Sequence, residues 1–549
     1  MSNTQSSNHL NKLTLGGLIV TLGIIYGDIG TSPLYVMKAI VGKQAIDTDV
    51  VLGAISCIFW TLTLQTTFKY VILTLRADNK GEGGIFSLYT LVKKLKKRWL
   101  IVPAIIGGSA LLADGIITPP ISVSSAIEGL KTYNPELNTI PIVISILFVL
   151  FFIQRFGTTF IGKFFGPLML LWFGMLGTLG VIHLFGNFSV LKAINPYYAF
   201  HLLSVHHEGF YVLGYVFLCT TGAEALYSDL GHCGVKNIRI SWIFVKSMLV
   251  INYFGQGAYL ISHQGSTLSE LSGNPSNPGN PFYLVMPDWF LPAGIAIATM
   301  AAVIASQALI SGSFTLISEA MRLNFWPKVL IKYPTDLKGQ LYIPSINWLL
   351  FIGCVFIVVH FEESGNMEAA YGLAIVLCMI MTTILLGFFM VLKRYNPFFI
   401  VGVLALYLSL EISFFIANIN KFSHGGYVSV IIAGLLAFVM IVWFTAKRIR
   451  KDYTEFVKLD QYKNVISELS NDLSIPKYAT HLVYMTNAAN SEEIESKVVY
   501  SILQKRPKRA DIYWFVHVNV TDEPYEMEYR VREIVKDDII RVDFYLGFR

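Results

Sequence analysis

Long apolar runs alternate with short polar segments along the first 450 residues of the chain. The runs fall at about 13–41, 49–75, 100–129, 139–157, 159–187, 209–231, 240–263, 288–317, 343–361, 368–392, 398–419 and 426–446. A helix that crosses about 30 Å of hydrocarbon needs roughly 20 apolar residues, so each run is long enough to span a membrane. The pattern predicts an all-α polytopic membrane protein, with twelve transmembrane helices in residues 13–450 after a short cytosolic segment, 1–12.

The pattern changes after Arg450, where charged and polar residues become frequent. Short apolar stretches at 481–485, 511–520 and 539–548 are typical of strands, and residues 491–506 are typical of a helix. Residues 451–549 are therefore predicted to form a cytosolic α/β domain. Since the sequence stops on a strand-like segment, we expect this domain to be incomplete.

Composition supports the membrane assignment. The chain is 54% hydrophobic and 14% charged, whereas soluble domains contain about 25% charged residues. The net charge of +6 does not indicate nucleic-acid binding, because the basic residues lie mostly in loops beside the apolar runs. The five cysteines show neither metal-ligand spacing nor a disulfide framework. No nucleophile, cofactor or P-loop pattern indicates an enzyme.

Basic residues occur in alternate loops. Lys and Arg are frequent in 76–98 and at 447–451, whereas 264–287 contains neither and 361–368 carries only glutamates as charged residues. By the positive-inside rule, this alternation places both termini in the cytoplasm. We expect the surrounding membrane to be the plasma (inner) membrane of a prokaryote. The basic segment 93–98 suits anionic lipid headgroups.

Three carboxylates lie inside apolar runs, next to glycines and hydroxyls. They are Asp28 in YGDIGTSP, Asp114 in ADGIITPPIS and Glu224 in TTGAEALYSD. Gly and Pro interrupt the helical hydrogen bonds, and free backbone groups persist at membrane depth only where they line a cavity. Transporters built from inverted repeats carry broken helices at corresponding positions. Because Asp28 and Glu224 lie in the first and sixth runs, we predict a five-plus-five repeat.

These segments offer only oxygen to a bound ion. Besides the acids, the oxygen-bearing side chains are Thr31, Ser32, Tyr35, Thr118, Ser122, Thr220 and Thr221. Such ligands suit an alkali cation better than a transition metal or Mg²⁺, and the carboxylates would repel an amino-acid carboxylate. Asp114, Thr118 and Ser122 share one face if their helix is continuous.

Intramembrane acids are usually functional. No Lys or Arg lies near the middle of most runs, although Lys246 is an exception near one end. Glu224 is our candidate for a proton-coupling acid, because its neighbours are mostly Ala, Gly and Leu. Glu411 could serve structural hydrogen bonding or ion passage, and Asp229 is interpreted as solvated.

Several motifs occur in order along the chain: YGDIGTSPLY (26–35), GEGGIFSLY (81–89), ADGIITPPISVSSAIEGL (113–130), TTGAEALYSDLGH (220–232), NYFGQGAYL (252–260), ASQALISGSFTLISEAMRL (305–323) and YIPSINW (342–348). Together they resemble the KUP/HAK/KT potassium uptake family. The resemblance implies a LeuT-like fold of the amino acid–polyamine–cation superfamily, with ten core helices in inverted repeat and two more. It also implies proton-coupled K⁺ import.

By the same resemblance, K⁺ would be bound by Asp28, Tyr35, Asp114, Thr118, Ser122, Thr221, Glu224 and Tyr371. The departures from the family pattern are mild: Ala113 precedes the acid where an aromatic is frequent, and Pro120 follows Pro119. The short tail puts nucleotide regulation, known in some relatives, in doubt.

We therefore predict K⁺/H⁺ symport by alternating access. The predicted partners are K⁺, H⁺ and the lipid bilayer, with a homodimer formed through the cytosolic domain and no cofactor. An amino-acid or polyamine symporter of the same fold stays open as an alternative. A passive K⁺ channel is a second alternative, although no TVGYG-like filter occurs.

Overall fold

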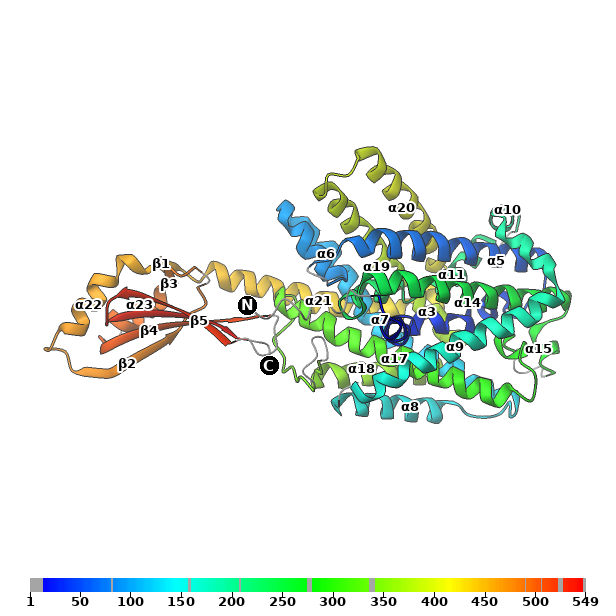
Figure 1. Cartoon of the computed structure of the whole chain (residues 1–549), viewed down its shortest axis with the longest axis horizontal. Coiled ribbons are helices and arrows are strands. Elements are labelled where there is room, and N and C mark those ends of the chain that lie inside the picture. Colours follow the sequence, from blue (N-terminus) through cyan, green and yellow to red (C-terminus); the bar gives the residue numbers. More distant parts are fainter. Residues whose placement is uncertain are drawn as a thin grey trace. The chain divides into compact units, whose positions relative to one another are not determined.

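The computed structural model of the chain describes residues 13–79, 82–156, 159–206, 209–273, 279–334, 341–488, 490–504, 506–521 and 527–546. The predicted N-terminal segment 1–12 lies outside them. The chain divides into two compact units. One is helical and comprises Met1–Pro334 and Leu341–Ile441, and the other comprises Thr335–Gln340 and Val442–Arg549 (Figure 1).

The helical unit contains the continuous helices that were predicted as spans. They are α5 (Thr48–Thr61) with the π-helix η2 (Leu62–Leu73), α7 (Ile101–Ile127), α8 (Ile140–Ile153), α9 (Thr159–Gly186), α14 (Val235–Ser262), α17 (Leu291–Arg322), α18 (Pro344–Phe361), α19 (Ser364–Leu392), α20 (Pro397–Ile419) and α21 (Gly426–Asp452). Shorter α-helices are α6 (Ile85–Val92), α10 (Tyr197–Val205), α13 (Leu230–Cys233), α15 (Leu268–Leu271) and α16 (Pro281–Leu284). Short 3₁₀ turns are η3 (Thr74–Arg76), η4 (Lys93–Leu95), η5 (Arg98–Leu100), η6 (Glu128–Thr132), η7 (Gln154–Phe156), η8 (Phe188–Ile194) and η10 (Phe422–His424).

Two predicted spans are broken, as their Gly and Pro residues indicated. The first consists of α2 (Leu15–Ile25), α3 (Gly27–Thr31), η1 (Ser32–Leu34) and α4 (Val36–Val41), and it bends by 71° after α2. The sixth consists of α11 (Gly209–Val216), η9 (Phe217–Thr220) and α12 (Ala223–Ser228). The third span differs, because α7 continues without a break through Pro119 and Pro120.

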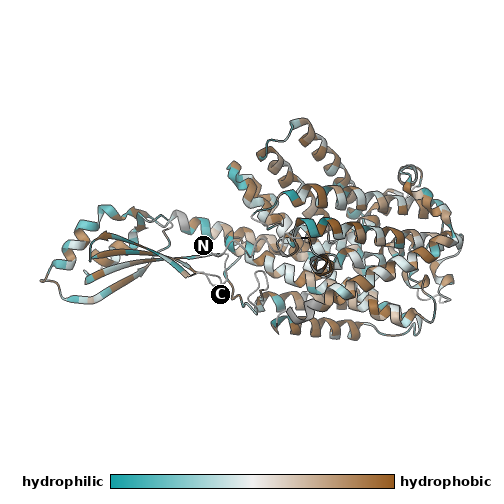
Figure 2. Cartoon of the chain, viewed as in Figure 1, coloured by the Kyte–Doolittle hydropathy of each residue, from teal (hydrophilic) through white to brown (hydrophobic). Residues whose placement is uncertain are grey.

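Judged by length and composition, fewer helices qualify as spans than the twelve that the sequence predicts. Among the described residues, ten helices are long and apolar enough to cross a membrane, and the bent first pair would make eleven. The run predicted at 139–157 forms a shorter apolar helix, Ile140–Phe156. The described part of the chain is thus mostly helical, with ten or eleven apolar helices that meet this test and one shorter apolar helix; the brown, hydrophobic ribbons are visible in Figure 2.

The helix α7 lies at the centre of the packing in this unit. It contacts α19, α17 and α18 along its length, and most of its side chains are buried. The short α3 packs directly on α17: a Cβ added at Gly27 would lie 2.6 Å from Ala305 Cα. A larger residue at position 27 would push the broken first span away from this scaffold.

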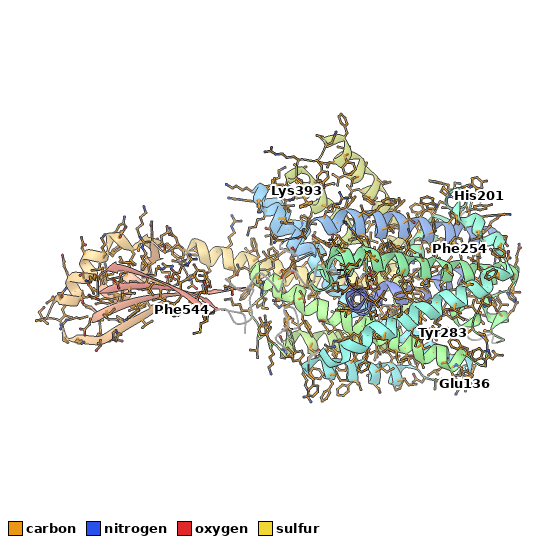
Figure 3. All side chains as sticks on the ribbon, viewed as in Figure 1. Glu136, His201, Phe254, Tyr283, Lys393 and Phe544 are labelled. Atoms are coloured by element: carbon orange, nitrogen blue, oxygen red, sulfur yellow. The ribbon has the colours of Figure 1, made fainter. Side chains whose placement is uncertain are left out.

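Two loops predicted to be external lie at one end of the helical unit, and a loop predicted to be internal lies at the other end. Figure 3 shows Glu136 and His201, from loops predicted to be external, at one end, and Lys393, from a loop predicted to be internal, at the other. The loops that carry Glu136 and His201 therefore lie at the same end of this unit, opposite the loop that carries Lys393.

The second unit is a small α/β fold. The described strands form a sheet in the order β2 (Lys477–Met485), β4 (Arg509–Val520), β6 (Ile539–Leu546) and β5 (Met527–Val535), with β5 antiparallel to β6 and the other pairs parallel. The helices α22 (Lys463–Asn471) and α23 (Ser496–Leu503) bury apolar side chains against it. A separate antiparallel pair joins β1 (Phe456–Lys458) to β3 (Glu493–Glu495), and η11 (Leu459–Gln461) follows β1.

The sequence predicted the three parallel strands of this unit and the helix that became α23. The helix is shorter than expected, because Glu493–Glu495 pairs as β3 before α23 begins. The sequence analysis missed β1, β5 and α22. The strand β5 is mostly exposed and carries many charges, so it lacks the apolar pattern that marks the others.

Candidate functional site

The two broken spans meet at their breaks. Gly222 lies between η9 and α12 with φ +85, a left-handed conformation that glycine adopts easily. A Cβ at this position would lie 2.8 Å from Ile29 N and 3.0 Å from Asp28 Oδ2. Across the same junction, Thr221 Oγ1 lies 3.2 Å from Ser32 Oγ and 3.4 Å from Tyr35 Oη. Gly222 thus allows the two irregular segments to touch.

The tenth predicted span supplies a phenol to this junction. Tyr371 on α19 donates a hydrogen bond to Asp28, with Oη 3.3 Å from Oδ1 and 3.5 Å from Oδ2. Both side chains are buried. An isolated membrane tyrosine is usually an interfacial anchor, so only the family resemblance indicated Tyr371 beforehand.

The third predicted span forms the next wall. Thr118 Oγ1 donates to Asp114 Oδ1 at 2.5 Å, and Ser122 Oγ lies 3.5 Å from Thr31 Oγ1 of the first span. The helix α7 is continuous over these positions, so the condition for Asp114, Thr118 and Ser122 to share one face is met.

Two hydroxyl hydrogens at the junction are donated to backbone carbonyls. Thr221 donates to Leu218 O at 2.9 Å, and Thr31 donates to Asp28 O at 2.9 Å. Because a hydroxyl has one hydrogen and two lone pairs, these bonds leave oxygen lone pairs for other partners. A set of lone pairs and two carboxylates favours a cation and disfavours an anion.

Glu224 lies in a neighbouring cluster rather than in direct hydrogen-bond contact with the other predicted ligands. It is buried on α12, and Tyr70 Oη of the π-helix η2 donates to its Oε1. The structure therefore brings the predicted residues together in two adjoining groups. The first group contains Asp28, Tyr35, Asp114, Thr118, Ser122, Thr221 and Tyr371, and the second contains Glu224.

Sequence reasoning missed Lys69, which is fully buried inside the second predicted span. Its Nζ contacts Glu411 Oε1 at 2.6 Å, Tyr70 Oη at 3.1 Å and Met379 O at 3.1 Å. The side-chain exposure of Lys69 and Glu411 is 0%. Lys69 should have been noticed as the basic residue in FKYVILTL, where a charge inside an apolar run is costly.

Glu411 and Asp229 are both buried. Glu411, left open between two roles, forms the buried ion pair with Lys69 and accepts hydrogen bonds from Thr383 at 2.9 and 2.8 Å. The solvated environment expected for Asp229 is wrong: this residue is 8% exposed, because it caps α12 where that helix enters the packed unit.

The site is rich in oxygen ligands. Among the described residues, no group of three or more His, Cys, Asp or Glu side chains could hold a metal ion. The oxygens come instead from two carboxylates, hydroxyls and phenols, which suit a large, weakly hydrated monovalent cation.

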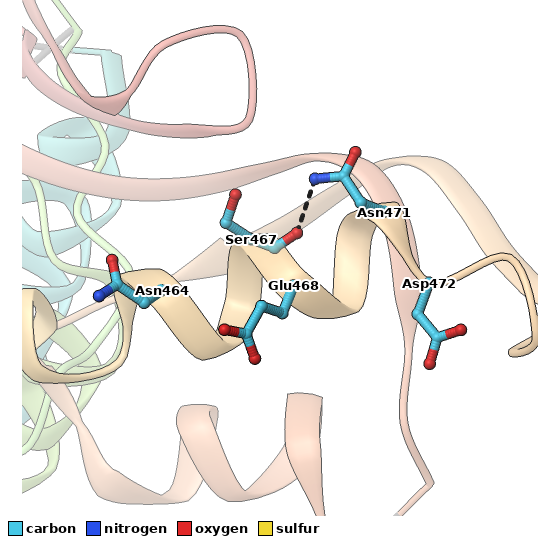
Figure 4. Close-up of a pocket in the computed structure, with 5 residues that line it drawn as sticks. All are labelled: Asn464, Ser467, Glu468, Asn471 and Asp472. Carbon is cyan, nitrogen blue, oxygen red and sulfur yellow. Dashed lines mark hydrogen bonds between the residues drawn. The ribbon is translucent and has the colours of Figure 1, made fainter.

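The second unit has a surface depression along α22. Its lining residues are Asn464, Ser467, Glu468, Asn471 and Asp472, and Figure 4 shows them on one side of the helix, with Asn471 bonded to Ser467 O at 2.9 Å. The two carboxylates would repel a nucleotide phosphate, so this depression does not suit the regulator considered above.

Broken helices that enclose buried carboxylates and hydroxyls inside a polytopic bundle define an ion transporter. Comparison with known proteins specifies its kind. Residues 15–448 match the K⁺ potassium transporter integral membrane domain, and residues 479–549 match the K⁺ potassium transporter C-terminal domain. The chain belongs to the K⁺ potassium transporter family.

Similar curated proteins agree with this assignment. Each of the following is named "Probable potassium transport system protein Kup". The protein of Flavobacterium psychrophilum is 70% identical over 546 residues, which cover 99% of this chain and 83% of that protein. Those of Cytophaga hutchinsonii and Clostridium perfringens are 62% and 52% identical, covering 99% and 100% of this chain and 83% and 85% of theirs.

A solved structure, that of a manganese transporter from Eremococcus coleocola, has 13% identity and a TM-score of 0.41, covering 79% of this chain and 93% of that one. This likeness is too weak to argue from.

Proposed function

We propose that the protein takes up K⁺ by K⁺/H⁺ symport across the plasma membrane of a prokaryote. In this proposal twelve spans cross the bilayer, ten of them form a five-plus-five inverted repeat, and both termini are cytoplasmic. The K⁺ site lies between the broken first and sixth spans, with α7 and α19 as its other walls.

The observation that carries the proposal is the convergence at the two breaks. Tyr371 lies within hydrogen-bond distance of Asp28, and Thr221 lies within hydrogen-bond distance of Ser32, so three separate parts of the sequence meet at the breaks. All four are buried. A K⁺ ion that loses its water would recover oxygen contacts here from carboxylate, phenol, hydroxyl and backbone groups.

Charge distinguishes K⁺ from an amino-acid substrate. An amino acid would bring a carboxylate close to Asp28 and Asp114, which carry the same charge. In transporters of amino acids, bare helix N-termini receive the substrate carboxylate. Here carboxylates occupy the corresponding breaks, so the site favours a cation without an acid group.

Glu224 is the proposed proton-coupling acid. It is 3% exposed and lies on the broken sixth span, one turn from Thr221. A carboxylate that can gain and lose a proton beside a cation site links the two ions, because each charge state changes the affinity for the other ion.

The test is K⁺ uptake into proteoliposomes with an imposed inward proton gradient and a clamped membrane potential. We expect the gradient to drive uptake by the wild-type protein, and we expect Glu224→Gln to lose the dependence on the gradient. Asp28→Asn should abolish uptake under all conditions. Equal K⁺ entry without a gradient in both proteins would reject symport in favour of a passive pathway, and full uptake by Asp28→Asn would reject the site.

The proposed role of the second unit is dimerisation. Its test uses the full-length chain and a chain that ends at the close of α21, both in detergent. Loss of the dimer on truncation is the expected result, and a truncated chain that stays dimeric would reject this role.

A further inference from the structure

Lys69 forms a complete set of hydrogen bonds. An ammonium group has three hydrogens and no acceptor, and Lys69 Nζ has three acceptors within 3.1 Å: Glu411 Oε1, Tyr70 Oη and Met379 O. The acceptors come from three elements, α20, η2 and α19. A buried charge without such partners would be strongly destabilising.

This arrangement fixes the direction of the Tyr70 hydroxyl. Since Lys69 can only donate, Tyr70 Oη must accept from it, and the single hydrogen of Tyr70 is then free to point elsewhere. The structure directs that hydrogen at Glu224 Oε1. Glu224 Oε1 accepts this hydrogen bond, which fixes one side of the carboxylate relative to η2.

The π-helix makes this geometry possible. Lys69 and Tyr70 are adjacent in sequence, yet both are buried on the same side of η2 together with Gln65 and Thr66. Consecutive side chains turn by about 100° in an α-helix, and the wider π turn makes this angle smaller, so the two neighbours diverge less. Long π-helical segments are rare, and π turns occur frequently at functional sites.

We propose that Lys69 is a positioning residue for the K⁺ site. It acts through Tyr70, whose hydroxyl it orients toward Glu224 so that this carboxylate is held in place beside the ion, while Glu411 balances its charge. The inference rests on the proposed function, in which Glu224 belongs to the ion site. It adds residues that the family resemblance did not indicate.

The proposal is tested by ⁸⁶Rb⁺ binding to the purified full-length chain, with Rb⁺ as the probe for K⁺. The central variant is Lys69→Met combined with Glu411→Gln. This pair of changes removes the orienting ammonium but keeps the net charge of the cluster, so that a long-range charge effect on the cation cancels. It also avoids leaving one buried charge unpaired.

We expect the double variant to raise the dissociation constant for Rb⁺ about tenfold, the size of one lost hydrogen bond to a charged group. Tyr70→Phe alone should give a similar increase, and adding it to the double variant should cause little further loss, because both changes break the same connection. In uptake assays the effect should appear in KM rather than in kcat.

The matched control is Lys246→Met. Lys246 is half-buried on α14, and its Nζ donates to Thr63 Oγ1 of the same π-helix at 2.9 Å, but it does not reach Tyr70. Its loss should leave Rb⁺ affinity within about twofold, inside the scatter of ordinary single contacts.

The outcomes separate the two proposals. Unchanged Rb⁺ affinity in Asp28→Asn would overturn the proposed site itself, and unchanged Rb⁺ affinity in Glu224→Gln alone would remove Glu224 from that site and overturn the role of Lys69. Reduced affinity in Glu224→Gln with wild-type affinity in Tyr70→Phe would leave the site standing and overturn the role of Lys69. Fully additive losses from Tyr70→Phe and the double variant would also overturn it, since Lys69 would then act by another route. Tyr70→Phe removes a single oxygen, so it keeps the test decisive even if the double variant fails to fold.

Discussion

Gly222 is the position at which the two broken spans depend most directly on each other. Replacing it with alanine adds one methyl group at φ +85, where an L-residue costs roughly 1–2 kcal/mol. The new Cβ would also lie 2.8 Å from Ile29 N and 2.9 Å from Asp28 Cβ, below ordinary contact distance. The breaks would have to separate by roughly 0.5 Å, the tolerance within which a binding site must hold its ligands.

We therefore expect Gly222→Ala to raise the KM for Rb⁺ uptake by about tenfold or more, equivalent to about 1.4 kcal/mol, and to lower the midpoint of thermal unfolding. Uptake is measured in proteoliposomes at several Rb⁺ concentrations, with unfolding followed on the same preparations. Gly312→Ala is the control, because it lies in α17 with open space around an added Cβ. Wild-type KM in Gly222→Ala would refute contact between the breaks at this point.

Three further predictions concern other parts of the chain. Tyr371→Phe loses the long hydrogen bond to Asp28 at 3.3 Å and should raise KM for Rb⁺ about threefold in uptake assays; a larger change in kcat than in KM would contradict a ligand role. Lys38→Met leaves Glu128, its partner at 3.0 Å, buried without a counter-ion. The free energy of unfolding, measured in denaturant titrations, should fall by about 3 kcal/mol. An unchanged unfolding midpoint would show that this ion pair does not stabilise the fold. Burial alone would raise the pKa of Glu495, but hydrogen bonds from Asn487 N at 2.9 Å and from the Thr486 hydroxyl lower it below its ordinary value of 4.5. The stability that Glu495 provides is therefore present at neutral pH and is lost as the pH falls below about 4.5. In the whole chain, the protection of β4 amides from hydrogen exchange should fall over this pH range. In Glu495→Gln, this protection should be lower at neutral pH and should not fall further in acid.

The broken spans could be predicted because their signal is local. Gly, Pro and hydroxyl residues around Asp28 and Glu224 interrupt apolar runs, and the bilayer leaves few structures that such a sequence can adopt. Periodicity likewise placed Asp114, Thr118 and Ser122 on one face of α7. These features depend on neighbours in sequence, which a single chain displays.

The Lys69 cluster could not be predicted in the same way, because its partners are far apart in sequence. Lys69 and Glu411 are separated by 342 positions, and neither carries a motif that names the other. The π-helix adds a second difficulty, since apolar periodicity assumes the 3.6-residue turn of an α-helix. Tyr371 is a similar case, because its role depends on a contact with Asp28 that no local pattern encodes.

The π-helix also has a consequence for how this span can change over time. Its 12 residues, Leu62–Leu73, follow wide turns in which each amide reaches five residues back. Deleting a single residue just before Lys69, with α-helical spacing beyond the deletion, would rotate the following side chains by about 100° about the axis. Lys69 and Tyr70 would then leave their common face, although both residues would still be present in the sequence. The number of residues in this span therefore matters as much as their identity. In aligned sequences, a one-residue gap here should separate transporters that share this arrangement from those that do not.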